Sequence, residues 1–363
     1  MQQETSVKAF EIHVDRKDIR RANLVETPAP IAGPGQAVLQ IEGFSLTTNN
    51  VTYAATGDII HYWKFFPTGV DGQGIVPVWG FAHVVDSNSD ALTKGARLYG
   101  FFPMASHLTI TPQARGSSTV MDMAAHRKDL PVVYNTYRRV GATDPTEDAK
   151  RALFQPLLAT SFLLFDFLTD NDWFKAEQII IGSASSKTGL GLAKYLAEAK
   201  PDVPAIIGLT SDSNRAFVTS LDACDQITTY DALEGEIAQR PSVYVDMAGN
   251  ADVRSRLHHH LGDNMVYSCA VGTSHWDKFT PTGDMPGSRP RFFFAPSQIE
   301  KRRADWGPGV IDRRIDEAWR RIADTSGGWM QIKTDTGAKA ALKTYRDLAM
   351  GIMQPNVGHY IAL

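Results

Sequence analysis

The chain has 363 residues, of which 43% are hydrophobic and 21% charged, and its formal net charge is −3. This length allows two domains with full hydrophobic cores, and the small, scattered charge gives no indication of a nucleic-acid or anionic-membrane partner. The only cysteines, Cys224 and Cys269, exclude a disulfide framework and a four-cysteine zinc site. The first ten residues contain no apolar run, so we expect no secretory signal and a cytoplasmic protein.

Residues 8–112 consist of short apolar runs separated by glycine and proline. This pattern predicts a β-rich domain that closes into a distorted barrel. The expected strands are 38–41, 74–78, 82–85, 97–101 and 107–110. A polar segment, 47–57, interrupts the pattern and predicts a short helix that ends at Gly57. Such an interruption is a place where a functional site can lie.

Residues 113–150 are less regular and contain Pro131, Gly141 and Pro145. They are either a surface excursion or the wall of a substrate pocket. The apolar run that follows, residues 153–168, is shorter than a membrane span requires. We therefore interpret it as a buried helix.

Residues 178–193 have the pattern of a buried strand, a turn of glycine and serine, and a helix, which is typical of a phosphate-binding site. Two nucleotide-binding motifs can contain such a turn. The mononucleotide P-loop requires Gly-x-x-x-x-Gly-Lys-Ser/Thr, but the stretch from Gly182 to Lys187 is one residue too short, and Ser186 replaces the second glycine. The dinucleotide motif requires glycines where the helix begins, and Gly189 and Gly191 supply them. The turn therefore favours a dinucleotide.

Strands and helices alternate after this turn. The expected strands are 205–209, 226–230, 243–246 and 265–271, and the expected helices are 214–221 and 253–261. Repeated strand–helix units predict a doubly wound parallel sheet, that is, a Rossmann domain. Further expected elements are a last strand over 291–295, helices over 310–322 and 338–353, and a terminal strand over 359–363.

This order of elements resembles the medium-chain dehydrogenase/reductase superfamily, in particular its zinc-independent, quinone-oxidoreductase-like branch. The resemblance covers nearly the whole chain and is most specific at residues 186–193, 243–249 and 345–358. The chain departs from the family at residues 183–187, where the loop is longer and rich in hydroxyls, so we expect a divergent subfamily. The resemblance implies an α/β fold with a GroES-like domain over 1–150, a Rossmann NADP(H)-binding domain over 151–298 and a C-terminal return to the first domain over 299–363.

We expect no bound metal. The zinc branch of the superfamily has a Gly-His-Glu ligand set and a four-cysteine lobe, and this chain has neither. The consecutive residues His258, His259 and His260 would point about 100° apart on a helix, so we interpret them as an exposed helix turn. Asp246 could imitate the acidic strand end of a P-loop protein, but the resemblance implies that this strand packs beneath the cofactor without a metal.

The second expected strand ends without a carboxylate, and Arg215 follows it. An NAD site usually has an acidic residue at this position, whereas a 2′-phosphate requires its absence and a nearby cation. We therefore expect NADP(H), although Asp212 would repel the phosphate if it turned inward, and Lys187 is a second possible cation. The expected cofactor contacts are Gly182, Ser183, Ser185, Ser186, Lys187, Thr188, Gly189, Gly191, Thr210, Ser211, Arg215, Ala248, Ser268, Ala270 and Gly272.

Quinone-oxidoreductase relatives have a tyrosine four residues before a glycine, and Tyr53 and Gly57 reproduce this spacing. The resemblance implies that Tyr53 donates a hydrogen bond to a substrate carbonyl; the alternative is a tyrosine with a purely structural role. Asn49 and Asn50 could position the substrate or the cofactor ribose. The expected substrate wall consists of Tyr134, Asn135 and Tyr137.

Three functions remain open. The first is an NADPH-dependent reductase of an activated alkene or a quinone, the second a zinc-free carbonyl reductase or alcohol dehydrogenase, and the third an NADPH-sensing protein without turnover. In each case the ligand is a small molecule, with no nucleic-acid or membrane partner. We also expect a homodimer, because an apolar strand over 291–295 at the sheet edge can pair with its copy in a second subunit.

Overall fold

The structure, a computed structural model, describes residues 8–272 and 285–363. The chain divides into two compact units. Unit 1 comprises residues 1–153, 332–353 and 357–363, and unit 2 comprises residues 154–331 and 354–356. The sequence-based division grouped all of 299–363 with the first domain, whereas residues 299–331 lie in unit 2.

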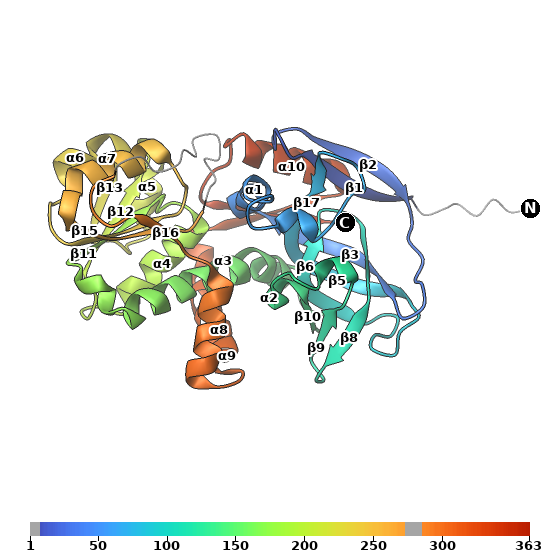
Figure 1. The fold of residues 1–363 in the computed structure, drawn as a ribbon. Coiled ribbons are helices and arrows are strands. Elements are labelled where there is room, and N and C mark those ends of the chain that lie inside the picture. The colour runs from blue at the N-terminus through green and yellow to red at the C-terminus, as the bar shows by residue number, and fades with distance from the viewer. Residues whose placement is uncertain (1–7, 273–284) are drawn as a thin grey trace, which may run out of the picture. The chain divides into compact units, whose positions relative to one another are not determined.

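Unit 1 is built mainly from strands, which confirms the β-rich prediction (Figure 1). A three-stranded antiparallel sheet has the order β2-β1-β4. A nine-stranded sheet has the order β17-β18-β3-β5-β6-β10-β9-β8, with β7 paired to β3. The strands are β1 (Lys8–Asp15), β2 (Ala22–Pro28), β3 (Ala37–Leu46), β4 (Gln73–Ile75), β5 (Pro77–Ser87), β6 (Arg97–Pro103), β7 (His107–Ile110), β8 (Pro112–Arg115), β9 (Thr119–Asp122), β10 (Thr136–Arg139), β17 (Gln331–Thr336) and β18 (Val357–Ala362).

Residues 113–150 were expected to be a surface excursion or a pocket wall, and the first of these expectations is wrong. This segment contains most of β8, all of β9 and β10, the short helix α2 (Val132–Asn135) and the start of α3. Strand β10 pairs with both β6 and β9, so the segment extends the large sheet. These strands are only four residues long, and β8 is mostly exposed, so they lack the alternation that reveals a longer strand.

Two longer helices complete unit 1. Helix α1 (Thr48–Ala55) confirms the short helix expected over 47–57. It begins there because the Thr47 side chain accepts a hydrogen bond from the Asn49 N–H, while the Asn50 side chain bonds back to the Thr47 N–H. Helix α10 (Ala338–Ala349) is fixed by Tyr345, whose hydroxyl donates to the carbonyl of Ile19.

Unit 2 contains six parallel strands in the order β13-β12-β11-β14-β15-β16, which confirms the doubly wound sheet. The strands are β11 (Gln178–Gly182), β12 (Ala205–Thr210), β13 (Gln226–Thr229), β14 (Ser242–Asp246), β15 (Met265–Ala270) and β16 (Pro290–Phe292). The helices are α4 (Lys187–Glu198), α5 (Asp212–Ser220), α6 (Leu233–Glu236), α7 (Ala251–Leu261), α8 (Ala295–Trp306) and α9 (Val310–Asp324). Every residue of β11 is buried, as expected of a strand covered on both faces; Figure 1 shows α6 and α7 on one side of the sheet and α4 on the other.

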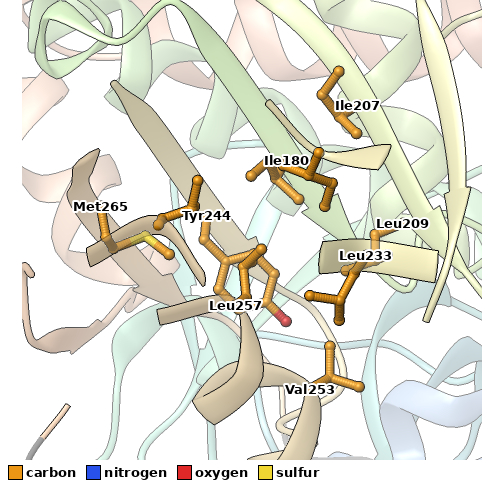
Figure 2. Close-up of a cluster of buried hydrophobic side chains, with 10 residues drawn as sticks. Ile180, Ile207, Leu209, Leu233, Tyr244, Val253, Leu257 and Met265 are labelled. Carbon is orange, nitrogen blue, oxygen red and sulfur yellow. The ribbon is translucent and has the colours of Figure 1, made fainter. Parts of the chain in front are cut away.

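A hydrophobic cluster joins the sheet of unit 2 to α7 (Figure 2). Ile180, Leu209 and Tyr244 come from three adjacent strands, and Val253 and Leu257 come from the helix. Full burial of one such side chain contributes about 1.5–3 kcal/mol to folding. This packing holds the carboxyl ends of the strands in fixed positions.

Helix α3 (Pro145–Asp170) is longer than the expected buried helix. By length and composition it could cross a membrane, so the prediction that the apolar segment is too short was wrong. More than half of its most apolar stretch is buried within the protein, however, as in the core helix of a soluble protein. The division between the two units falls within this helix, after Leu153.

Candidate functional site

The turn between β11 and α4 has a fixed, unusual backbone. Ser183 adopts a left-handed conformation, with φ at +53°, which is unfavourable for a residue other than glycine. Two backbone hydrogen bonds hold it: the Ala184 N–H donates to Leu209 O at 3.0 Å, and the Ser186 N–H donates to Ser183 O at 2.8 Å. The shape of the turn is therefore held by hydrogen bonds within the protein.

The glycines that follow the turn are required by close packing. The Ser186 side chain caps α4 by accepting a hydrogen bond from the Gly189 N–H at 3.1 Å. A Cβ atom on Gly189 would lie 2.7 Å from the Ser183 carbonyl oxygen, and one on Gly191 would lie 2.5 Å from Ser161 Oγ of α3. The positive end of α4 is thus drawn close to the turn, the arrangement that attracts a phosphate.

Hydroxyl groups connect this turn to the carboxyl end of the neighbouring strand β12. Ser185 Oγ accepts hydrogen bonds from Asn214 Nδ2 at 3.1 Å and from Thr210 Oγ1 at 3.4 Å. Ser211 and Ser213 bond to each other at the start of α5, at 3.0 Å. The structure therefore brings the expected cofactor residues Ser185, Thr210 and Ser211 to one edge of the sheet.

The charged side chains at this edge differ in burial. Arg215 and Asp212 are exposed on the first turn of α5. Lys187, at the start of α4, is half-buried, and its Nζ donates to the Pro355 carbonyl at 3.4 Å. Burial lowers the pKa of Lys187 to about 8. Its charge is therefore sensitive to pH in the neutral to mildly alkaline range. Thr188, the next residue, accepts a hydrogen bond from Ser161 through its carbonyl.

Tyr230 is a residue at this edge that the sequence analysis missed. It directly follows β13, its hydroxyl lies near Ser183, and its ring packs against the cluster in Figure 2. Burial raises the pKa of Tyr230, so its hydroxyl stays protonated. Its position at the end of a parallel strand is the signal that could have found it, because ligands bind at that end of such sheets.

Asp246 ends β14 and organises the next turn. Its carboxylate accepts hydrogen bonds from the N–H groups of Ala248, at 3.2 Å, and Gly249, at 2.8 Å, and it pairs with buried Arg254. Burial raises the pKa of Asp246. The N–H group of Ala248 is thus engaged by the protein itself. Within the described parts of the chain, no group of three histidine, cysteine, aspartate or glutamate side chains is placed to hold a metal ion.

The interpretation of the three histidines as an exposed helix turn was wrong for His258. His258 is fully buried, because it shares the inward face of α7 with Leu257 and Leu261. One ring nitrogen of His258 lies 3.0 Å from Ser268 Oγ and the other lies 2.9 Å from the Pro286 carbonyl.

The Ser268 hydroxyl is therefore engaged with a histidine inside unit 2. The other two residues expected to contact cofactor on this strand end, Ala270 and Gly272, are half-exposed. They remain candidates for contact with a ligand, whereas Ser268 has a partner within the fold.

The polar residues of α1 in unit 1 have different roles. Asn50 is buried, and its side chain accepts from the Thr47 N–H at 2.7 Å and donates to the Pro77 carbonyl at 2.8 Å. Both polar atoms of the Asn50 side chain are therefore bonded to the backbone of unit 1. Asn49 is half-buried and lies four residues before Tyr53, on the same face of the helix.

Tyr53 lies in a cluster of aromatic rings in unit 1. Its side chain is only 6% exposed, and its ring centre is 4.4 Å from that of Tyr62 and 5.5 Å from that of Phe101. Trp79 Nε1 donates a hydrogen bond to the Tyr53 hydroxyl at 3.3 Å. Burial raises the pKa of Tyr53, so the phenol remains neutral and can donate its proton in a hydrogen bond.

Of the three residues expected in a substrate wall, only Tyr134 joins this cluster. Its ring centre is 4.6 Å from that of Phe101, and its hydroxyl bonds to that of Tyr62 at 2.9 Å. Tyr62 is a second residue that the sequence analysis missed, since only the fold brings it to Tyr134, 72 positions later.

Asn135 and Tyr137 belong to the core of unit 1 instead. Asn135 donates to the Arg127 carbonyl at 2.9 Å. Tyr137 is fully buried, donates to the Phe101 carbonyl and accepts from Arg127, both at 2.9 Å. Their polar groups therefore support β10 and its neighbours, and only Tyr134 of the three remains next to Tyr53.

Comparison with known proteins identifies relatives of this fold. A family model described as "Protein of unknown function (DUF2855)" matches residues 44–354. No curated protein matches the chain. Among solved structures, CurA from Vibrio vulnificus in complex with NADPH is similar, with 11% identity, a TM-score of 0.64, and coverage of 97% of this chain and 98% of that chain.

Two further solved structures are similar over nearly their whole length. The Etr1p/NADP/crotonyl-CoA complex has 12% identity and a TM-score of 0.58, covering 98% of this chain and 100% of that chain. The quinone oxidoreductase from Coxiella burnetii has 14% identity and a TM-score of 0.54, covering 98% and 99%. These likenesses confirm the predicted fold, a β-rich GroES-like domain combined with a Rossmann domain.

Proposed function

Because the chain belongs to the family described as "Protein of unknown function (DUF2855)" and has the medium-chain dehydrogenase/reductase fold, we propose that it is an NADPH-dependent oxidoreductase. The acceptor in this proposal is an activated alkene or a quinone. The observation that carries it is the neutral, buried phenol of Tyr53, which is hydrogen-bonded on its oxygen and retains a proton to donate.

The carboxyl edge of the unit 2 sheet supports NADP(H) as the cofactor. Strand β12 ends in Thr210 without a carboxylate, and Ser211, Ser213 and Arg215 follow at the start of α5. Hydroxyls and a guanidinium are suited to a 2′-phosphate. The pyrophosphate would lie at the Ser183–Ser186 turn and the start of α4, where the positive end of the helix dipole attracts an anion. The similar structures of CurA and Etr1p were solved with NADPH and NADP.

The proposed chemistry needs a hydride and a group that stabilises negative charge. When bound, the reduced nicotinamide supplies the hydride. As the hydride reaches an alkene carbon conjugated to a carbonyl, or a quinone ring, negative charge develops on the carbonyl oxygen. Tyr53 donates its hydroxyl proton to that oxygen in a hydrogen bond, which stabilises the charge where it forms. No metal is required for this step.

A two-part experiment tests the proposal. Purified protein is first titrated with NADPH and NADH, and NADPH oxidation is then followed with an enone, a quinone and a saturated ketone. We expect tighter binding of NADPH, and turnover with the enone or the quinone. Turnover with the ketone alone would indicate a carbonyl reductase or alcohol dehydrogenase. Binding of NADPH without turnover on the whole panel would indicate a sensing protein.

We also propose that the protein forms a homodimer through β16. This strand is at the end of the six-stranded sheet, and Phe292 within it is 52% exposed. The strand is shorter than the expected 291–295, because α8 begins at Ala295 and Phe293 turns inward. An exposed apolar edge can be satisfied by a second copy. A stable monomer in sedimentation at micromolar concentration would contradict this proposal.

A further inference from the structure

We propose that Trp79 is a positioning residue for the reaction: its indole N–H binds the oxygen of Tyr53 and thereby directs the Tyr53 proton toward the substrate. This inference rests on the proposed function, in which Tyr53 is the catalytic donor. It adds a residue that acts through Tyr53, on a strand that the sequence analysis did not connect with the site.

The direction of the hydrogen bonds follows from what each group can donate. An indole N–H can only donate, whereas a phenol has one proton and an oxygen that accepts. In the pair of Trp79 and Tyr53, therefore, Trp79 is the donor and the proton of Tyr53 is not used. With the Trp79 N–H on its oxygen, Tyr53 has its proton available for a second group.

Trp79 is well placed to fix this direction. It lies on β5 directly opposite Phe101 of β6, with ring centres 5.2 Å apart. On another side it stacks on Tyr99, at 5.8 Å and 28°. Tyr134 borders it at 6.2 Å. A ring held between three others has little freedom to rotate, so its N–H group points in one direction.

The same unit contains a matched control. Trp63 is also buried, and its Nε1 has no hydrogen-bond partner among the described residues. Its ring packs against Gly57 and Gly74, where a Cβ would lie 2.3 Å from it. Replacing Trp63 with phenylalanine removes the same atoms as the equivalent change at Trp79. It removes no hydrogen bond.

The kinetic test compares Trp79→Phe, Trp63→Phe, Tyr53→Phe and the double variant Tyr53→Phe/Trp79→Phe, on the enone or quinone that the panel identifies. We expect Trp79→Phe to lower kcat about three- to tenfold, the usual effect of one neutral hydrogen bond, with KM within about twofold. Trp63→Phe should leave kcat within about twofold. The double variant should be no slower than Tyr53→Phe alone, because Trp79 acts only through the missing hydroxyl.

The outcomes separate this inference from the proposed function. If Tyr53→Phe loses turnover but Trp79→Phe behaves like Trp63→Phe, the inference is overturned and the proposed function stands. If the losses from Tyr53→Phe and Trp79→Phe multiply in the double variant, Trp79 has only a structural role and the inference is also overturned. If Tyr53→Phe has full turnover, the catalytic step and the inference fail together.

A second measurement needs neither substrate nor a Trp79 variant. Nuclear magnetic resonance of protein labelled with ¹⁵N-tryptophan resolves the indole N–H signals of the seven tryptophans. The hydrogen bond to Tyr53 should displace the Trp79 signal downfield. In Tyr53→Phe that signal should move upfield, while the Trp63 signal stays in place. Unchanged indole signals in Tyr53→Phe would show that the hydrogen bond is absent and would overturn the inference.

Discussion

The two candidate sites of this protein, one in each unit, are built in opposite ways. In unit 2, the turn from Ser183 to Ser186 is made of consecutive small residues, and its shape comes from the backbone and from Gly189. In unit 1, the surroundings of Tyr53 come from separate elements, with Trp79 26 residues away in the chain and Tyr134 further still. A site shaped by the backbone can be encoded by a few consecutive residues. A site shaped by side chains from separate elements can be altered by substituting one aromatic residue.

The largest expected effect is the loss of turnover when the Tyr53 hydroxyl is removed. If the phenol stabilises a developing oxyanion, Tyr53→Phe should lower turnover about tenfold to a thousandfold, while NADPH affinity stays within about twofold. Steady-state kinetics and a fluorescence titration of NADPH measure the two effects. Tyr195→Phe is a matched control, because the buried Tyr195 hydroxyl has no hydrogen-bond partner among the described residues. Equal turnover in Tyr53→Phe and the wild type would return Tyr53 to a structural role.

In unit 2, by contrast, a substitution is expected to weaken the binding of NADPH. Arg215→Ala should weaken NADPH binding by about 1.5–3 kcal/mol, the range for a hydrogen bond to a charged group. Binding of NADH, which lacks the 2′-phosphate, should be unaffected and is the internal control. Both affinities can be measured by calorimetry. Equal affinities of the wild-type protein for NADPH and NADH would contradict the proposed 2′-phosphate site.

A smaller effect on the cofactor side is expected from pH. The pKa of Lys187 is lowered to about 8, so the side chain is charged below pH 8 and becomes neutral above it. If Lys187 attracts the cofactor phosphates, NADPH affinity should fall severalfold as pH rises from about 7 to 9. Lys187→Met should bind NADPH more weakly at pH 7, with little change up to pH 9. Wild-type affinity that is constant over this range would exclude Lys187 from phosphate binding.

No effect at all is expected from metal removal. The proposed chemistry uses Tyr53 in place of a Lewis acid, so dialysis against a chelator should leave turnover within experimental error. Metal analysis of the purified protein is the accompanying measurement. A tightly bound zinc ion whose removal abolishes turnover would refute the prediction.

The fold was largely predictable because its strongest patterns are local. The apolar run of β11 and the glycines after it were recognised from adjacent residues, and α1 was found from its polar cap and from Gly57. The strands within residues 113–150 were missed for a physical reason. Each has four residues, and pairing with distant strands, as β10 does with β6, stabilises them more than their own composition does.

The site was predictable only where neighbours in space are also neighbours in sequence. Ser185 and Thr210 were expected at the cofactor edge and lie together there. Trp79 and Tyr62 reach Tyr53 only through the folded sheet, so no spacing rule points to them. His258 was misplaced because a run of three histidines looks polar, although one of them shares the buried face of α7.

The order of the two units along the chain has a consequence for folding during synthesis on the ribosome. Strand β18 pairs with β3, and the helix that bears Tyr53 starts immediately after β3. A nascent chain that has reached residue 331 thus holds nearly all of unit 2 but lacks the last partner of β3. Domains usually complete their folding as their residues emerge. We therefore expect unit 2 to complete its folding first, and β3, which leads into the helix of Tyr53, to gain its partner β18 only after residues 357–362 have been synthesised.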